Sequence, residues 1–137
     1  AKKSDASQAG EMLIGRSLQA SFTVNDLKKS LAWYRDIVGF TVTDEHVRDG
    51  QLRAVSLQAG DVRILIGQDD GAKGADRVKG QGFSVMITTT GNVERIADGI
   101  RRRGGTLLAE PTDMPWGARI FRLKDPDGFA INIASMK

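Results

Sequence analysis

One pattern of secondary structure occurs twice along this chain: a strand, a helix and then three further strands. The second copy follows the first at an offset of 66 residues (93 minus 27), and the helix start, a buried helix position and the glycine after the helix recur together. The related pairs are Leu27 and Val93, Leu31 and Ala97, and Gly39 and Gly105. Duplication of this kind indicates two similar units that bury their apolar faces together. We therefore expect an α+β fold of two βαβββ modules.

The first module begins with residues 18–24, whose side chains alternate between apolar and polar. Such alternation predicts a strand with one buried face. Asp26 then caps a helix, and Gly39 ends it. The apolar positions of this helix are Leu27, Leu31, Tyr34 and Val38, at helical spacing. Three further strands are predicted at residues 40–45, 51–58 and 62–67.

The second module begins with another alternating strand near residues 83–88. A helix over residues 92–103 follows and ends at the Gly104-Gly105 pair. The remaining strands are predicted at 106–109, 118–124 and 129–134, with a turn at Asp125–Gly128 between the last two. The predicted organisation is a flexible tail over 1–15 and a single domain over 16–137, with modules at 16–67 and 82–136 joined by the loop 68–81.

The composition of the chain limits the cellular locations and the binding partners that we expect. The chain has no cysteine, and no apolar run approaches the ~20 residues needed to span a bilayer. No apolar stretch follows Lys2 and Lys3, so we expect no signal peptide, a cytoplasmic location and no membrane partner. The dense cationic run Arg101-Arg102-Arg103 falls at the end of a predicted helix, where cations complement the helix dipole. We therefore interpret it as a solvated helix end and expect no nucleic-acid partner.

Two motifs give the chain a family resemblance. The first comprises Val24-Asn25-Asp26-Leu27, Ser30-Leu31, Trp33-Tyr34-Arg35-Asp36 and Gly39-Phe40. The second comprises Trp116-Gly117-Ala118-Arg119-Ile120-Phe121 and Asp125-Pro126-Asp127-Gly128. Together with the duplication, they resemble the vicinal oxygen chelate superfamily, which includes glyoxalases, bleomycin-resistance proteins and extradiol dioxygenases. The resemblance covers about residues 17–136 and implies curled, cup-shaped mixed sheets with helices on the outer face.

The enzymes of that superfamily hold a divalent metal with two ligands from each module. At the positions that the resemblance aligns with three of these ligands, this chain has Gln19, Ser84 and Asn132. The fourth would lie on the strand 62–67, which contains no histidine, aspartate or glutamate. Divalent metals need several converging carboxylate or imidazole ligands. We therefore expect no metal and no other cofactor.

The alternation also predicts which side chains line the cup. Gln19 shares a strand face with Ser21 and Thr23, and these small polar residues suit a wet or ligand-filled wall. Trp116 either covers the core or stacks on a ligand, and Arg119 either holds an anionic or carbonyl group or pairs with an acidic neighbour. The candidate ligand-binding residues are Gln19, Ser21, Thr23, Ser84, Met86, Thr88, Trp116, Arg119, Phe121 and Asn132.

The resulting hypothesis is a metal-free protein that sequesters a small organic molecule such as an antibiotic, as the bleomycin-resistance branch does, with no catalytic residue. Open sheet edges and a half-covered cup further predict a homodimer. The alternative is a lyase, isomerase or dioxygenase of the same fold acting on a small metabolite. Its acid–base candidates are Glu45, His46 and Glu110, although His46 is interpreted first as an exposed loop histidine. A third option is a regulatory or carrier module.

Overall fold

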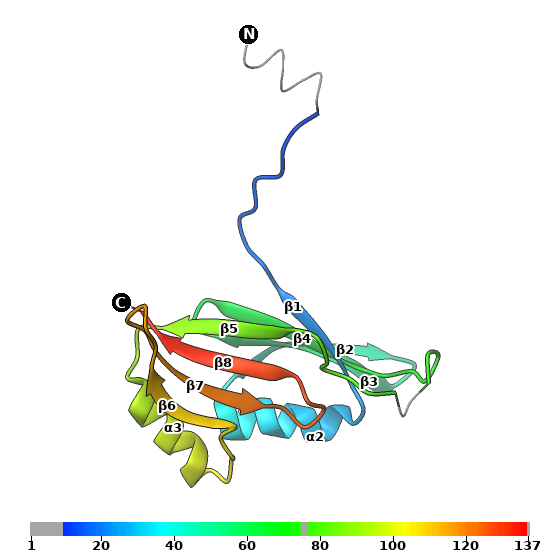
Figure 1. Cartoon of the computed structure of the whole chain (residues 1–137). Helices are drawn as coiled ribbons and strands as arrows, with labels where there is room; N and C mark the ends of the chain where they lie inside the picture. Colours follow the sequence, from blue (N-terminus) through cyan, green and yellow to red (C-terminus); the bar gives the residue numbers. More distant parts are fainter. Residues whose placement is uncertain (1–9, 75–76, 137) are drawn as a thin grey trace.

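The computed structural model describes residues 10–74 and 77–136, which form two four-stranded mixed sheets (Figure 1). The first sheet has the order β1-β4-β3-β2, and the second has the corresponding order β5-β8-β7-β6. The strands of the first are β1 (Ala20–Val24), β2 (Thr41–Arg48), β3 (Gln51–Ala59) and β4 (Val62–Gln68). Those of the second are β5 (Ser84–Thr89), β6 (Ala109–Asp113), β7 (Arg119–Lys124) and β8 (Ala130–Ser135). The predicted α+β fold with curled mixed sheets is confirmed.

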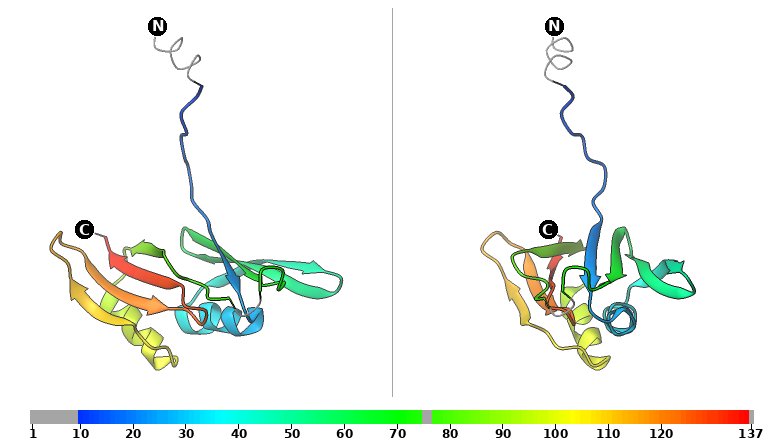
Figure 2. Two further views of the ribbon diagram at one scale, coloured as in Figure 1. Left: turned by 45° about the vertical axis from the view of Figure 1, so that its right-hand side comes forward. Right: turned by 90° about the vertical axis from the view of Figure 1, so that its right-hand side faces the viewer.

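Each module places its first strand parallel to its last. β1 pairs in parallel with β4, and β5 pairs in parallel with β8, while the other pairings are antiparallel. A parallel pair needs a crossover, and the helix of each module supplies it. The helices lie on one side of the sheets, and the two sheets lie next to each other (Figures 1 and 2). No helix within residues 10–74 and 77–136 covers the opposite faces of the sheets.

Side-chain capping hydrogen bonds and a glycine with positive φ set the helix boundaries. The side chain of Asp26 accepts a hydrogen bond from the Lys29 backbone N–H at 3.2 Å and caps α2 (Leu27–Ala32). This helix continues as a wider π-type turn, η1 (Trp33–Val38), and ends at Gly39, whose φ of 110° disfavours a residue with Cβ. Asn92 caps α3 (Val93–Arg102) in the same way. The predicted cap at Asp26 and the stop at Gly39 are confirmed, whereas Asn92, the predicted first residue of the second helix, is its cap.

Three strands depart from their predicted bounds by two residues or more. β1 begins at Ala20, so Gln19 precedes the strand, and β6 begins at Ala109, where the prediction ended. β2 continues to Arg48, so His46 lies on a strand opposite Ala54 and the prediction of a loop histidine was wrong. The reason is that ladder pairing with β3 extends an edge strand whose residues are polar and solvent-exposed. Such a strand has no hydrophobic alternation by which the sequence would reveal it.

Three aromatic rings join the modules within one chain. The Phe22 ring of β1 stacks on Phe129, which precedes β8, with 4.5 Å between their centroids. Phe83 approaches Phe129 at 5.6 Å and Phe22 at 6.1 Å. Phe22 and Phe129 are buried, and each such side chain contributes about 1.5–3 kcal/mol by its removal from water. One continuous hydrophobic core therefore connects the helix-facing sides of both modules.

A buried polar contact crosses the same boundary. The Tyr34 hydroxyl donates a hydrogen bond to Asp125 Oδ2 at 2.7 Å. The other carboxylate oxygen of Asp125 accepts hydrogen bonds from the backbone N–H groups of Asp127 and Phe129, which closes the predicted turn. Tyr34, which the helical spacing predicted to pack, is fully buried. Burial raises the pKa of Tyr34 well above its usual range, and burial also raises the pKa of Asp125.

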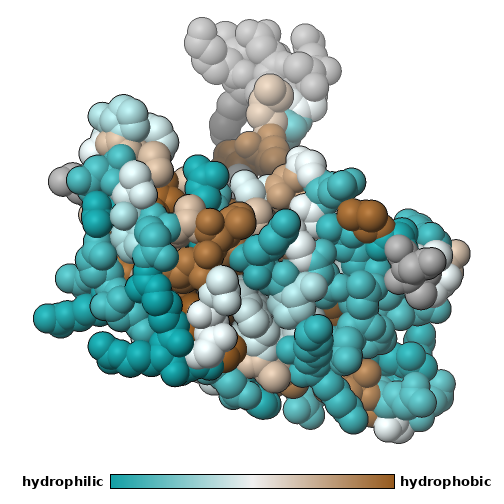
Figure 3. Space-filling view, turned by 60° about the horizontal axis from the view of Figure 1, so that its bottom comes forward, coloured by the Kyte–Doolittle hydropathy of each residue, from teal (hydrophilic) through white to brown (hydrophobic). Residues whose placement is uncertain are grey.

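Residues 10–19 extend away from the body of the protein (Figures 1 and 2). Met12, Leu13, Ile14 and Leu18 are exposed there. The rest of the predicted tail, residues 1–9, lies outside the described residues. None of the helices within residues 10–74 and 77–136 is long and apolar enough to cross a lipid bilayer. From the side that carries the helices, the surface is mainly hydrophilic (Figure 3).

The raised pKa of Tyr34 predicts a loss of stability in alkali. The unfolded chain ionises this tyrosine near its ordinary pKa of about 10, whereas the folded chain keeps it protonated. The stability that the folded protein gains by keeping Tyr34 protonated is thus complete below about pH 10. It is lost as the pH rises above that value towards the folded-state pKa. Urea unfolding at a series of alkaline pH values should show a falling free energy of unfolding, and Tyr34→Phe should flatten that fall.

Tyr34 is the single tyrosine of the chain, so the ultraviolet absorbance of the phenolate reports this group alone. We expect the phenolate signal to develop together with unfolding. A phenolate that forms in the still-folded protein would contradict the buried hydrogen bond to Asp125.

Candidate functional site

Each sheet has one face against the helices and one open face, and the strand register assigns every residue to one of them. On β1, Phe22 and Val24 are buried on the helix side, whereas Ser21 and Thr23 are exposed on the open face. On β5, Ser84, Met86 and Thr88 are exposed and pair in register with Ala130, Asn132 and Ala134 of β8. The structure therefore places Ser21, Thr23, Ser84, Met86, Thr88 and Asn132 on the open faces, as the alternation predicted.

Arg119 and Phe121 do not belong to this surface. Phe121 is fully buried, pairs with Ile133 and faces the core on the helix side. Arg119 lies on the same side, where its guanidinium bonds Glu94 of α3 and, at 3.0 Å, Asp113. These acidic neighbours raise the pKa of Arg119 further above its usual value. The prediction that these two residues line the cup was wrong.

The error has a physical cause in β7, which buries apolar side chains on both faces. Ile120 is buried on the open face, where it joins a small cluster with Ala118, Ala134 and Met114. A strand with two buried faces gives no alternation that distinguishes core from cup. Only the register of β7 with β8 shows which of its side chains face the helices and which lie on the open face.

Trp116 lies in the turn between β6 and β7. The turn is closed by backbone hydrogen bonds from Met114 N–H to the Ala118 carbonyl and from Gly117 N–H to the Met114 carbonyl. The Trp116 residue is 69% exposed, so it does not cover the core. Of its two predicted roles, stacking on a ligand remains a prediction.

The positions that the resemblance aligns with metal ligands do not fit a metal. Gln19 precedes β1 and borders a 260 Å³ pocket together with Gln58 and Arg63, whereas Ser84 and Asn132 lie on the second sheet. All three aligned side chains are neutral. Within the described residues, no three histidine, cysteine, aspartate or glutamate side chains come together as a metal site. We therefore derive no chemistry through a bound metal.

The acid–base candidates of the alternative hypothesis are not brought together. His46 lies on β2, an edge strand of the first sheet, with Nε2 3.1 Å from Ser56 Oγ. Glu45 is its neighbour on that strand. Glu110 lies on β6, an edge strand of the second sheet, and pairs with Arg101. Arg101 also pairs with Asp98 at 2.8 Å, which agrees with the interpretation of a solvated helix end.

A hollow with a volume of about 310 Å³ lies where the two modules meet. We call it the junction pocket. It is lined by Ser21, Thr23, Arg77, Val78, Lys79, Gly80, Gln81, Phe83 and Phe129. The sequence identified only Ser21 and Thr23, because the remaining residues come from the segment between the modules and from the core. The junction pocket is the place where predicted open-face residues, a cation and an aromatic side chain converge.

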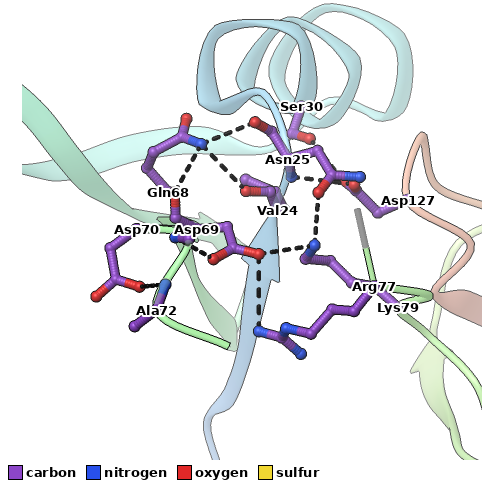
Figure 4. Close-up of polar contacts among 11 residues, drawn as sticks. Val24, Asn25, Ser30, Gln68, Asp69, Asp70, Ala72, Arg77, Lys79 and Asp127 are labelled. Carbon is purple, nitrogen blue, oxygen red and sulfur yellow. Dashed lines mark hydrogen bonds and ion pairs between the residues drawn. The ribbon is translucent and has the colours of Figure 1, made fainter. Parts of the chain in front are cut away.

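The segment that lines the junction pocket is held by a buried lysine (Figure 4). Lys79 Nζ lies 2.8 Å from Asp69 Oδ2 and donates a hydrogen bond to Asn25 Oδ1 at 2.5 Å. The side chains of Lys79 and Asp69 are only 2% and 4% exposed. Lys79, with the Gly71 backbone N–H, lowers the pKa of Asp69 below its usual value. We call Asn25, Asp69, Lys79 and Asp127 the lysine clamp.

The lysine clamp ties the segment to both modules. The Asn25 backbone N–H donates to Asp127 Oδ1 at 3.0 Å, and Ser30 Oγ donates to Asp127 Oδ2 at 3.3 Å. Gly80 also lies directly on the β7–β8 turn: a Cβ there would come within 2.5 Å of the Gly128 carbonyl, and its φ is +75°. Residues 77–81 thus form one wall of the junction pocket. The sequence predicted only a loop here, since the partners of Lys79 are distant along the chain.

Removing the buried cation should destabilise the protein. In Lys79→Met the side chain keeps its length, but the Asp69 carboxylate loses its charged partner in a site that excludes water. Breaking a buried pair from one side is strongly destabilising, so we expect the melting temperature to fall by roughly 10 °C or more. The control is Lys28→Met on the exposed surface of α2, which should change the melting temperature little. Equal melting temperatures for the two variants would contradict the role of the lysine clamp.

The comparisons with known proteins agree with this architecture. The model of the glyoxalase/bleomycin resistance protein/dioxygenase superfamily matches residues 16–133. The chain therefore belongs to this superfamily. No curated protein matches the sequence.

Solved structures show the same fold at low sequence identity. A superfamily member from Sphaerobacter thermophilus is 23% identical with a TM-score of 0.74, and the match covers 91% of this chain and 100% of that one. TioX from Micromonospora sp. ML1 is 16% identical with a TM-score of 0.72, over 88% and 98% of the two chains. A virulence protein from Salmonella typhimurium is 20% identical with a TM-score of 0.69, over 92% and 100%.

Proposed function

We propose that this protein binds and sequesters a small organic molecule, an antibiotic among the candidates, on the open faces of its sheets, without a metal. The observation that carries the proposal is the meeting of hydroxyl and aromatic side chains in the junction pocket, which Ser21, Thr23 and the half-exposed Phe83 line together. Sites for small molecules are concave and combine apolar walls with a few placed polar groups. The junction pocket, at about 310 Å³, is at the lower end of the usual volume for such sites.

The remaining open-face residues extend the proposed site beyond the junction pocket. Met86 is exposed beside Ser84 and Thr88, and a flexible thioether adapts to apolar groups of different shape. Asn132 adds an amide with both a donor and an acceptor. An amphipathic organic ligand suits this mixture better than a highly charged one. We also propose a cytoplasmic location, in keeping with the absence of cysteine.

A binding assay tests the proposal directly. The protein would be titrated calorimetrically with a panel of aromatic antibiotics and metabolites, and each binder would be measured again with variants. Thr23→Val, which removes one hydroxyl at constant volume, should weaken binding by about 0.5–1.5 kcal/mol. Trp116→Ala should weaken it by about 1–3 kcal/mol through lost area and stacking. His46→Ala serves as the control and should bind as the parent protein does. Unchanged affinity in both test variants would mean that the ligand binds elsewhere.

We further propose that two copies pair and so cover the open faces. Within the described residues, β1 and β5 are edge strands of their sheets, and exposed edges favour pairing with another chain. Pairing would also convert two half-covered surfaces into an enclosed cup. A closed two-fold dimer is the commonest assembly that achieves this.

Light scattering at micromolar concentration should give twice the 14.8 kDa mass of one chain. Met86→Asp places a charge on the open face and should shift the equilibrium towards the monomer. Thr106→Asp, an exposed position outside the sheets, is the control and should leave the mass unchanged. A parent protein with the mass of one chain would contradict the proposed dimer.

A further inference from the structure

Arg77 stands out in the junction pocket because its guanidinium is accessible. The side chain is 39% exposed and borders both the junction pocket and an adjoining hollow of about 250 Å³. Its contact with Asp69 Oδ2 is long, at 3.8 Å, whereas Lys79 lies 2.8 Å from the same oxygen. Asp69 is therefore engaged mainly by Lys79. Among its contacts with described residues, Arg77 is left with donors that a ligand can use.

We propose that Arg77 recognises the carboxylate of a small aromatic acid in the junction pocket. The inference rests on the proposed function, small-molecule binding, and names the class of ligand. A guanidinium presents its N–H groups as a planar fork that matches the two oxygens of a carboxylate. Arg77 would thus perform the role that the sequence analysis assigned to Arg119, whose donors are used by Glu94 and Asp113.

The aromatic half of the ligand would lie against Phe83. This residue is 49% exposed, yet its ring is held from behind by Phe22 and Phe129. A ring fixed in this way offers a preorganised surface for offset or edge-to-face contact with a second ring. Ser21 and Thr23 lie along the same pocket and can donate hydrogen bonds to ring substituents or to the carboxylate.

The charges around Arg77 determine on which side the carboxylate binds. The adjoining hollow contains the carboxylates of Asp69 and Asp70 and the cation of Lys73, so its lining carries both signs of charge. The two carboxylates there offset the attraction of Lys73 for an anion. Among the residues that the structure describes, the lining of the junction pocket includes Arg77 and Lys79 and no acidic residue. An anionic ligand is therefore favoured on the junction side, next to Phe83.

The test uses three probes with one ring system: 2-naphthoate, its neutral analogue 2-naphthamide, and 2-naphthyl phosphate. Affinities would be measured by calorimetry, and the site located by amide chemical shifts of the full chain. We expect naphthoate to bind at least about tenfold more tightly than naphthamide, with the largest shifts at residues 21–23 and 77–83. Arg77→Gln should remove this preference while leaving the affinity for naphthamide unchanged.

Arg63→Gln is the matched control, since it removes the same charge from the protein but at β4 and at a different pocket. It should keep the preference for naphthoate. Arg77→Lys keeps the charge without the fork, and it should retain only part of the preference. If Arg77→Gln does not fold, as judged by its circular dichroism, Arg77→Lys tests the role of Arg77. A reduced preference for naphthoate in that variant supports the role, and an undiminished preference contradicts it.

The outcomes separate this proposal from the one on which it rests. Equal affinity of the parent protein for naphthoate and naphthamide, or tighter binding of the phosphate, would overturn the assignment of a carboxylate. Naphthoate binding that Arg77→Gln leaves intact would overturn the role of Arg77. In both cases small-molecule binding would stand. If neither these probes nor any compound of the larger panel binds, the proposed function itself fails.

Discussion

The contact between the two modules is the constraint on which the rest of the structure depends. Phe22 stacks on Phe129, and the Tyr34 hydroxyl bonds the Asp125 carboxylate across the same boundary. Because both contacts lie on the helix side, each module contributes its apolar face to one core and leaves its other face open. The open faces are consequently the parts of the sheets on which polar side chains such as Thr23 and Asn132 can gather.

The same boundary turns the connecting segment into part of the candidate site. A loop of this composition would gain little by packing on its own, since it is polar and rich in glycine. Lys79 changes this by forming an ion pair with Asp69 in a place from which water is excluded. The charge pair is costly to bury unless both partners are satisfied, so the contacts of Lys79 with Asp69 and Asn25 favour one position for residues 77–81. That position brings Arg77 beside Phe83.

The superfamily contains both enzymes and binding proteins, so membership by itself leaves the activity open. Our proposal of binding rests on the residues of this chain. The positions aligned with metal ligands carry neutral side chains, and Glu45 with His46 lies on a different sheet from Glu110. The junction pocket, by contrast, combines hydroxyl groups, an arginine and an exposed ring in one hollow. Such a set is suited to holding an organic molecule by shape and hydrogen bonding.

The sequence by itself determined the features that depend on near neighbours. The duplicated order of elements, the cap at Asp26 and the stop at Gly39 follow from local hydrogen bonding and backbone sterics, and all are found. Period-two alternation also placed Ser21 and Thr23 opposite Phe22 correctly, since one face of β1 is clearly apolar.

Tertiary structure alone decided the features that depend on distant partners. β7 buries Ile120 on one face and Phe121 on the other, so only its pairing with β8 could show that Arg119 faces the helices. His46 lies on a strand because β3 pairs with it, although nothing in its own hydropathy pattern predicts one. The buried position of Lys79 depends on Asn25, which is 54 residues away in the sequence. Alternation tells which residues share a face, but the partner that covers that face determines whether it becomes core or binding surface.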